Sequence, residues 1–252
     1  MKALQALMML MLVHASKHIS MKKSYLSIQL WSWMNAVVSF DLYTKKIIKD
    51  KESKYAIIAI HGFNGDENSF DPVVELINLK QASWYLPRAP YLSKWKDKEG
   101  NSWFSGNDEI GWEYKKTFSG MQNLINRIMQ DGFLPEEIFL MGFSQGACLA
   151  LEFGLRLPFE VGGLIPIAGF IKFKELLIKE ASIKSKQSPI LLMHGSQDDV
   201  IPISASETTY QILSDMNYKV KFLKYDLGHK IPINKRDQIK NFIINRNQAR
   251  ST

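Results

Sequence analysis

A serine flanked by two glycines is the residue of this chain best suited to chemistry. The apolar run Ile138–Met141 leads into Gly142-Phe143-Ser144-Gln145-Gly146, and a helix-forming segment rich in small residues follows. Gly-x-Ser-x-Gly between a strand and a helix makes a turn so tight that it needs its glycines, and the serine hydroxyl is left exposed at its tip. The pattern alone arises by chance in about one chain in ten of this size. Its position after an apolar strand therefore carries the prediction that Ser144 is a nucleophile.

A nucleophilic serine needs a histidine as its general base. In enzymes built around such a turn, the acid and then the histidine follow the serine along the chain. The chain has five histidines: His14, His18, His61, His194 and His229. The first three precede Ser144, and His194 ends an apolar strand, where it is expected to shape a turn with Gly195. His229 follows a glycine on a loop beyond the last predicted strand, so it is the predicted base.

The acid of the triad is expected on a loop between Ser144 and His229. The segment after the strand at residues 189–193 presents Asp198 and Asp199 side by side. A carboxylate there would hold the imidazole in the correct tautomer and stabilise its protonated form. Spacing does not choose between the two, and either could instead be a helix N-cap. Asp226 is a third candidate, although it lies close to His229 in sequence.

Two backbone N–H groups should stabilise the oxyanion of the tetrahedral intermediate. Each such donor is worth roughly two to three orders of magnitude in rate. One is the amide of the residue after the nucleophile, Gln145. The other is expected where an early strand, residues 55–60, meets the loop His61-Gly62-Phe63-Asn64-Gly65. The amide of Phe63 is the candidate, and an ordinary glycine-rich turn is the alternative reading of that loop.

Alternating β and α segments make up the rest of the chain. Strands are expected at residues 39–48, 55–60, 83–86, 138–142, 163–167, 190–194 and 219–225, and helices at 72–79, 117–131, 145–157, 173–182, 204–216 and 234–245. Such alternation predicts an α/β fold with a mostly parallel central sheet and helices on both faces. Only 54 positions separate Ser144 from Asp198, which leaves no room for a large cap domain there.

The stretch from residue 88 to residue 116 is the longest segment predicted to be irregular. Long loops in compact domains are often functional, so it is assigned to the rim of the substrate pocket. Trp103 and Phe104 are the predicted substrate-binding residues within it. An open, apolar rim would suit esters or thioesters whose acyl chain lies along the surface.

Six landmarks occur in an order that resembles the phospholipase/carboxylesterase family, which includes bacterial carboxylesterases and acyl-protein thioesterases. They are His61-Gly-Phe-Asn-Gly-Asp66, Leu86-Pro-Arg-Ala-Pro90, Trp103-Phe104, Gly142-Phe-Ser-Gln-Gly146, His194-Gly-Ser-Gln-Asp198 with Val200-Ile-Pro202, and Gly228-His229. The resemblance covers roughly residues 40 to 246. It implies an α/β-hydrolase fold, Ser144 as nucleophile, Asp198 as acid, His229 as base, and oxyanion amides from Phe63 and Gln145.

The chain departs from the family pattern at two places. Ser105-Gly106-Asn107 stands where relatives often have an acidic residue, and Ala147-Cys148 follows the serine turn where a second glycine is common. Both bear on the shape of the acyl pocket and leave the chemistry unchanged. The resemblance implies a reaction that needs neither a metal nor an organic cofactor.

Composition agrees with an enzyme and limits its partners. At 252 residues with 46% hydrophobic content the chain can bury a full core. The single cysteine, Cys148, excludes an intramolecular disulfide and is read as a small buried hydrophobe. The net charge of +7 permits weak contact with anionic membrane surfaces. No basic cluster interleaved with aromatic residues argues for nucleic acid, and both a monomer and a homodimer are compatible with the sequence.

The first 38 residues are predicted to lie outside a single hydrolase domain that spans residues 39–252. Lys2 followed by an apolar run and Val13-His14-Ala15 resembles a signal peptide. An extended start ahead of a cytoplasmic enzyme, with Met21 as the true start, is the alternative. Because the resembled family is mainly cytosolic, a cytoplasmic location is preferred over export.

The function predicted from these residues is hydrolysis of carboxylic esters or acyl thioesters through a covalent acyl-enzyme. Two alternatives stay open. The same site could serve a lysophospholipase or a serine peptidase, and the fold could belong to a catalytically silent protein that binds a ligand or partner.

Overall fold

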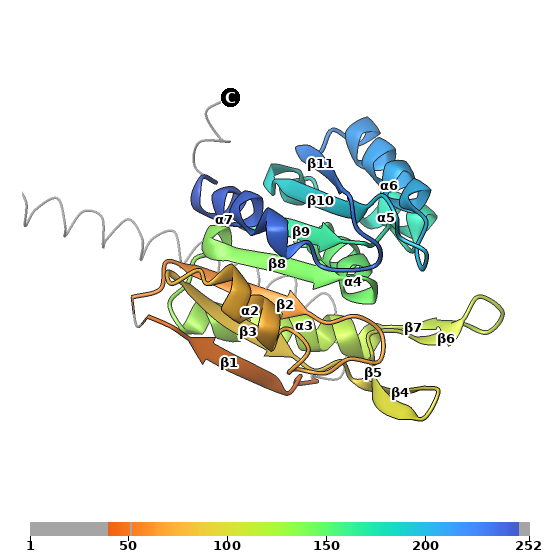
Figure 1. Cartoon of the computed structure of the whole chain (residues 1–252), viewed down its shortest axis with the longest axis horizontal. Helices are drawn as coiled ribbons and strands as arrows, with labels where there is room; N and C mark the ends of the chain where they lie inside the picture. The colour runs from red at the N-terminus through yellow and green to blue at the C-terminus, as the bar shows by residue number, and fades with distance from the viewer. Residues whose placement is uncertain (1–39, 51, 247–252) are drawn as a thin grey trace, which may run out of the picture. The chain divides into compact units, whose positions relative to one another are not determined.

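A single sheet organises residues 40–50 and 52–246, the part of the chain that this computed structural model describes. The seven strands of this sheet are ordered β1-β3-β2-β8-β9-β10-β11 (Figure 1). They are β1 (Thr44–Ile48), β2 (Tyr55–Ile60), β3 (Ala82–Pro87), β8 (Ile138–Phe143), β9 (Gly163–Ile167), β10 (Ile190–Gly195) and β11 (Val220–Tyr225). Only β1 among these seven strands runs antiparallel to its neighbour, which confirms the mostly parallel sheet.

The register of the sheet brings four chemically important loops to one edge. Ile60 of β2 lies opposite Gly142 of β8, and Phe143 of β8 lies opposite Ile167 of β9. Gly195, the last residue of β10, lies opposite Tyr225, the last residue of β11. The loops that follow β2, β8, β10 and β11 therefore leave the sheet at its carboxyl edge, where open α/β sheets place their ligand sites.

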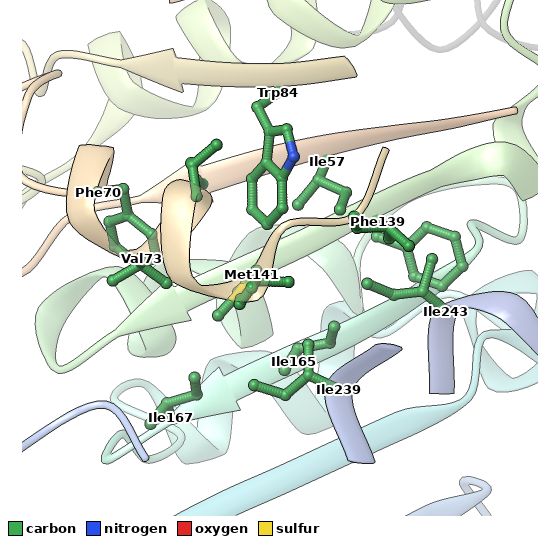
Figure 2. Packing of buried hydrophobic residues seen from close by; sticks show 14 of the residues in the cluster. Ile57, Phe70, Val73, Trp84, Phe139, Met141, Ile165, Ile167, Ile239 and Ile243 are labelled. Carbon is green, nitrogen blue, oxygen red and sulfur yellow. The ribbon is translucent and has the colours of Figure 1, made fainter. Parts of the chain in front are cut away.

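Helices cover both faces of the sheet, because a sheet whose strands are apolar on both sides needs two covers. On one face, α2 (Asp71–Ile77) and α7 (Arg236–Ile244) enclose a core of buried residues (Figure 2). Ile239 and Ile243 of α7 face Phe139 and Ile165 there. Phe139 is fully buried, so its truncation to alanine would cost about 3–5 kcal/mol.

The opposite face is covered mainly by α4 (Gln145–Gly154), which packs on β8, β9 and β2. Leu140, which points away from the α2 and α7 side, is fully buried there. The remaining helices are α3 (Lys115–Gln130), α5 (Lys174–Glu180) and α6 (Ile203–Asp215), and α6 packs against β10 and β11. The described residues between β8 and β10 form α4, β9, α5 and a short 3-10 turn, so no cap domain is inserted there.

The prediction that residues 88–116 are irregular is wrong. They form two hairpins: β4 (Tyr91–Trp95) pairs with β5 (Lys98–Ser102), and β6 (Ser105–Asn107) pairs with β7 (Gly111–Glu113). The first turn consists of Lys96 and Asp97, and Lys96 has a φ of 55°. Hairpin turns with positive φ are usually signalled by Asn-Gly or Asp-Gly. This turn lacks that signal, and β5 carries no large apolar residue.

Other boundaries differ by a few residues. The first strand begins at Thr44 rather than at residue 39, and α4 ends at Gly154 rather than at residue 157. The described residues belong to one compact unit. The predictions for residues 1–38, and the proposed domain boundary at residue 39, lie outside the described residues. None of the helices in the described part has the length and apolar character needed to cross a bilayer.

Candidate active site

Ser144 lies in a strained turn at the carboxyl end of β8. Its backbone has φ 54° and ψ −119°, a conformation that costs an L-residue free energy and that clusters at functional sites. A Cβ on Gly146 would lie 2.2 Å from the Ile60 carbonyl oxygen, and one on Gly142 would lie 2.2 Å from the Gly146 carbonyl oxygen. The glycines are required because backbone passes this close. The turn is fixed further by the Ser144 N–H, which donates to the Ile167 carbonyl at 2.9 Å.

The structure brings Ser144, His229 and Asp198 into one hydrogen-bonded line. The Ser144 hydroxyl lies 3.0 Å from His229 Nε2, and His229 Nδ1 lies 2.7 Å from Asp198 Oδ2. Because a carboxylate only accepts hydrogen bonds, Nδ1 carries the proton in this pair and Nε2 is free to accept from Ser144. The Asp198 side chain is fully buried, whereas the His229 side chain is 16% exposed. Asp198 is thus shielded while the imidazole still faces the site.

Backbone amides hold the Asp198 carboxylate in place. Its Oδ1 accepts hydrogen bonds from the N–H groups of Val200 and Ile201, both at 2.9 Å. Burial works to raise the pKa of the Asp198 carboxyl. The hydrogen bonds from Ile201, His229 and Val200 outweigh burial, and they hold the pKa below its ordinary value. The carboxylate is therefore ionised at neutral pH.

The other carboxylates considered from the sequence lie apart from the histidine. Asp199 is exposed, and Asp226 accepts a hydrogen bond from Gln197 Nε2 at 2.7 Å. Neither Asp198 nor Asp199 is the N-cap of α6, because that position belongs to Pro202. Of the three candidates, the structure places Asp198 against the imidazole.

The loop that carries His229 is anchored to the end of the sheet. The Tyr225 hydroxyl donates to the Lys230 carbonyl at 2.8 Å, and the Gln197 N–H donates to the Leu227 carbonyl at 3.1 Å. A Cβ on Gly195 would lie 2.2 Å from that Leu227 carbonyl. The acid loop and the histidine loop therefore pack backbone to backbone, which fixes the distance between Asp198 and His229.

The loop that carries Phe63 is fixed on the other side of the serine turn. The Gly65 N–H donates to the Gly62 carbonyl at 3.2 Å, and the Asn64 N–H donates to the Asn101 carbonyl at 2.9 Å. A Cβ on Gly62 would lie 3.5 Å from the Ser144 Cβ, so this loop runs directly beside the nucleophile. The amide of Gln145 is in the first turn of α4, where N–H groups have no intrahelical acceptor.

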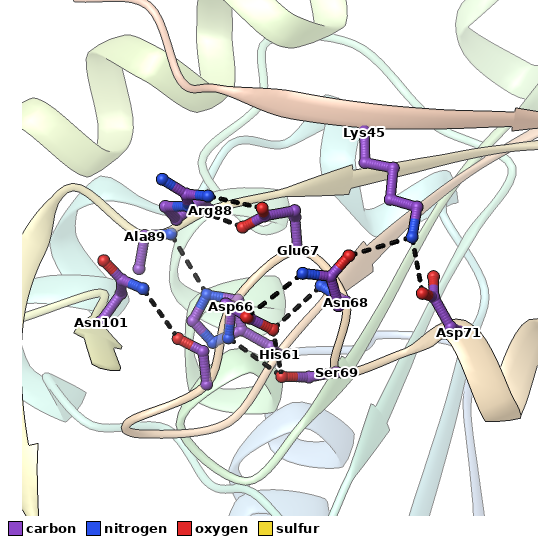
Figure 3. Close-up of polar contacts among 11 residues, drawn as sticks. Lys45, His61, Asp66, Glu67, Asn68, Ser69, Asp71, Arg88, Ala89 and Asn101 are labelled. Atoms are coloured by element: carbon purple, nitrogen blue, oxygen red, sulfur yellow. Dashed lines mark hydrogen bonds and ion pairs between the residues drawn. The ribbon is translucent and has the colours of Figure 1, made fainter. Parts of the chain in front are cut away.

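His61 is a structural residue beneath that loop (Figure 3). Its Nδ1–H donates to the Gly62 carbonyl at 2.7 Å, and its Nε2 accepts from the Ala89 N–H at 3.1 Å. Burial lowers the pKa of His61 to about 4, against the opposing effect of the hydrogen bond to Gly62. The ring is therefore neutral, and both its nitrogens are used to hold the start of the loop.

A polar network lies along the segment that follows His61 and reaches Lys45 of β1 (Figure 3). Arg88 makes a two-pronged ion pair with the buried carboxylate of Glu67 at 2.5 and 2.6 Å. Asp66 Oδ1 accepts from the N–H of Asn68 at 2.9 Å. The network also borders a cleft of about 260 Å³ that contains none of the triad residues. It stiffens the loop that presents Phe63.

Trp103 and Phe104 are buried, with 0% and 3% of their surface exposed. The Trp103 indole donates to the His61 carbonyl at 2.8 Å, and the Trp103 N–H donates to Gln145 Oε1 at 2.9 Å. Trp103 therefore links the Phe63 loop to the residue after the nucleophile. Substrate contact by Trp103 and Phe104 stays a prediction, and it requires surface that these side chains do not expose here.

Sequence reasoning missed several residues that position the site. Ser102 accepts from Gln145 Nε2 at 2.9 Å, and Thr117 donates to the Trp103 carbonyl at 2.6 Å. Both side chains bond residues that are distant in sequence, so no local sequence pattern predicts their roles. Cys148 is buried, and burial raises the pKa of its thiol to about 11, which removes it as a second nucleophile. Within residues 40–50 and 52–246, no three His, Cys, Asp or Glu side chains are grouped to hold a metal.

Comparison with known proteins identifies the family of this chain. The sequence profile of the phospholipase/carboxylesterase family matches residues 44–247. Acyl-protein thioesterase 1 of Kluyveromyces lactis is 30% identical over 193 residues, which cover 68% of this chain and 84% of that protein. A probable inactive carboxylesterase of Oryza sativa is 24% identical over 69% of this chain and 78% of its own length.

The crystal structure of Arabidopsis thaliana SOBER1 superposes with a TM-score of 0.67 at 25% identity, and it covers 76% of this chain and 98% of that one. The profile match alone spans well over half of the sequence. The chain belongs to the phospholipase/carboxylesterase family of α/β-hydrolases.

Proposed function

We propose that this protein hydrolyses carboxylic esters and acyl thioesters through an acyl-enzyme formed on Ser144. The observation that carries the proposal is the line from Ser144 Oγ to His229 Nε2, 3.0 Å, and from His229 Nδ1 to Asp198 Oδ2, 2.7 Å. Both distances are within hydrogen-bonding range for a nucleophile, its base and the group that orients the base. Membership of a family with carboxylesterase and acyl-protein thioesterase relatives supports the same reaction class.

The proposed reaction has two halves that share one proton carrier. In the first, His229 Nε2 takes the proton of Ser144 as the oxygen attacks the substrate carbonyl. The imidazolium is stabilised by the ionised Asp198, and it then protonates the departing alcohol or thiol. In the second half, His229 activates water, which attacks the acyl-enzyme and releases the carboxylic acid and Ser144.

Two backbone amides, those of Phe63 and Gln145, are assigned the role of stabilising the negative charge on the tetrahedral oxygen. Support comes from their positions: a Cβ added to Gly62, the residue before Phe63, would be in van der Waals contact with Ser144, and the Gln145 amide begins α4. The positive end of the helix dipole adds to this stabilisation. Because the loop is held by His61 and Asn101, the donors need no reorganisation when charge develops.

A substrate panel tests the proposal and ranks its alternatives. Purified protein and a Ser144→Ala variant are assayed on p-nitrophenyl esters, acyl thioesters, lysophospholipids and peptides. We expect hydrolysis of the esters and thioesters by the parent, and none by the variant, whose circular dichroism should match that of the parent. Preferred cleavage of lysophospholipids would favour the lysophospholipase alternative, and preferred cleavage of peptides the peptidase.

A silent binding protein is the alternative outside enzymes, and the family does contain a relative named as a probable inactive carboxylesterase. The paired Ser144 and His229 argue against it here. Failure of a fluorophosphonate probe to label the protein would favour it. A cytoplasmic location, weak contact with anionic membranes and a monomeric or homodimeric state remain predictions, which fractionation, vesicle sedimentation and light scattering can test.

A further inference from the structure

A second histidine, His194, lies against the same carboxylate that orients His229. His194 is the residue before the last of β10, and its side chain is fully buried. Its Nε2 lies 3.3 Å from Asp198 Oδ2 and 2.9 Å from the Ile201 carbonyl oxygen. Asp198 Oδ2 therefore lies close to two imidazoles, those of His194 and His229.

The other nitrogen of His194 contacts a hydroxyl on α6. Nδ1 lies 2.7 Å from Ser206 Oγ. That hydroxyl is itself 2.7 Å from the Gly169 carbonyl oxygen, to which it donates. The His194 and Ser206 side chains are fully buried, so water does not supply a missing proton between them.

The hydrogen bonds of His194 determine how many protons its ring must carry. The carbonyl oxygens of Ile201 and Gly169 only accept, so each close contact requires a proton from its partner. Ser206 has one hydroxyl proton and gives it to Gly169. The contact between Nδ1 and Ser206 Oγ then needs a proton on Nδ1, and the contact with Ile201 needs one on Nε2. A neutral imidazole has one ring proton, so it would leave one of these contacts as two facing acceptors.

We propose that His194 is an imidazolium that carries both ring protons, and that it is a positioning residue for the acid of the triad. The negative charge of Asp198 balances the positive charge of His194, and a buried cation needs such a partner to be stable. The inference rests on the proposed function, because Asp198 matters to the reaction only as the partner of His229. His194 itself touches neither the substrate position nor Ser144.

The proposal has a consequence for the pH dependence of the reaction. The facing nitrogens of His194 and His229 are no more than 6.0 Å apart, because they lie 3.3 and 2.7 Å from the same oxygen. A fixed positive charge at this distance repels a proton on His229, and the kinetic experiment below measures what its removal changes. Asp198 is the one carboxylate in the contacts described for the His194 ring. Lys224, opposite His194 in β11, directs its ammonium to the exposed Glu207.

Nitrogen NMR of the intact parent protein tests the proton count directly. Two- and three-bond couplings between ring nitrogens and ring carbon-bound protons distinguish an imidazolium from either neutral tautomer, and His194→Gln assigns the signal. We expect both nitrogens of His194 to be protonated at neutral pH. A single protonated nitrogen there would overturn the inference, and hydrolysis of esters by the same sample would show that the proposed function still stands.

A kinetic experiment tests the positioning role. His194→Gln retains an N–H donor toward Ile201 but has no charge, so the acid limb of the kcat/KM profile should move upward by about one pH unit. Thr209→Val is the matched control. It removes another buried hydroxyl from α6, one that accepts from the Ile171 N–H and makes no contact with Asp198 that the structure describes.

We expect Thr209→Val to lower thermal stability without moving the acid limb. An unchanged limb in His194→Gln, or an equal shift in the control, would contradict the positioning role. If His194→Gln does not fold, sequential backbone and side-chain correlations in the parent assign the His194 signal, and the NMR result decides the proposal alone. A parent enzyme that hydrolyses no ester would overturn the proposed function and leave the proton count on His194 intact.

Discussion

Replacing Asp198 by asparagine should disable the reaction in a protein that still folds, although the loss of the charge beside His194 should lower its melting temperature. Asparagine has the shape of aspartate, and its oxygen can keep the two hydrogen bonds from Val200 and Ile201 at the Oδ1 position. The amide NH₂ then stands where Oδ2 accepted the His229 proton. A donor there forces Nδ1 to become an acceptor, so the remaining ring proton moves to Nε2 and faces Ser144. The base is then in the wrong tautomer.

The magnitude follows from the loss of a usable base. An equivalent change in a serine protease triad lowers kcat by about 10⁴, which corresponds to about 5.4 kcal/mol of lost transition-state stabilisation. We expect a loss of the same order in kcat for p-nitrophenyl ester hydrolysis, with KM nearly unchanged because Asp198 is buried away from substrate. Asp199→Asn, at an exposed neighbouring position, is the control and should retain the activity of the parent.

The reasoning would be refuted if Asp198→Asn kept more than about a tenth of the parent kcat. It would also be refuted if Asp199→Asn were the crippled variant. A cooperative thermal transition of Asp198→Asn above the assay temperature is required for either reading, since the assignment concerns chemistry and not folding.

Two further predictions concern stability. Gly146→Ala should destabilise the protein by about 3 kcal/mol or more, because the new methyl would lie 2.2 Å from the Ile60 carbonyl oxygen. Gly62→Ala is the control, since its methyl would have no neighbour nearer than 3.5 Å. In thermal melts this control should unfold close to the temperature of the parent. Burial lowers the pKa of His61 to about 4 in the folded state. As the pH falls, His61 is therefore protonated in the unfolded chain before it is protonated in the folded protein. Up to about 3 kcal/mol of stability should be lost as the pH falls from about 6.5 to 4. Urea unfolding of the parent and of His61→Gln across that pH range measures this, and an equal pH dependence in both would contradict it.

Much of the architecture could be predicted because it is encoded locally. Buried parallel strands such as β2 and β8 are continuous apolar runs, and each ends at a glycine-rich turn that marks its carboxyl end. Ser144 and His229 follow from such patterns together with their order in the chain. The same logic predicted the helices on both faces, with errors of a few residues at their ends, where capping side chains are absent.

The features that escaped prediction depend on contacts between distant segments. Asp198 and Asp199 are equivalent by spacing, and only the folded arrangement of the acid loop and the histidine loop puts Asp198 against the imidazole and leaves Asp199 exposed. The aromatic side chain of Trp103 favoured the prediction that it binds substrate. In the structure its indole N–H donates a hydrogen bond to the His61 carbonyl, at the start of the Phe63 loop. The role of His194 depends on a hydroxyl from α6, which no pattern in β10 announces.

The most direct measurement is the site and rate of labelling by a fluorophosphonate probe, read by mass spectrometry of the digested protein. If His229 activates Ser144, the probe adds to Ser144 alone, Ser144→Ala is not labelled, and His229→Ala is labelled at least about 10² times more slowly. Labelling at another residue, or an unchanged rate in His229→Ala, would contradict the proposed pairing of these two side chains.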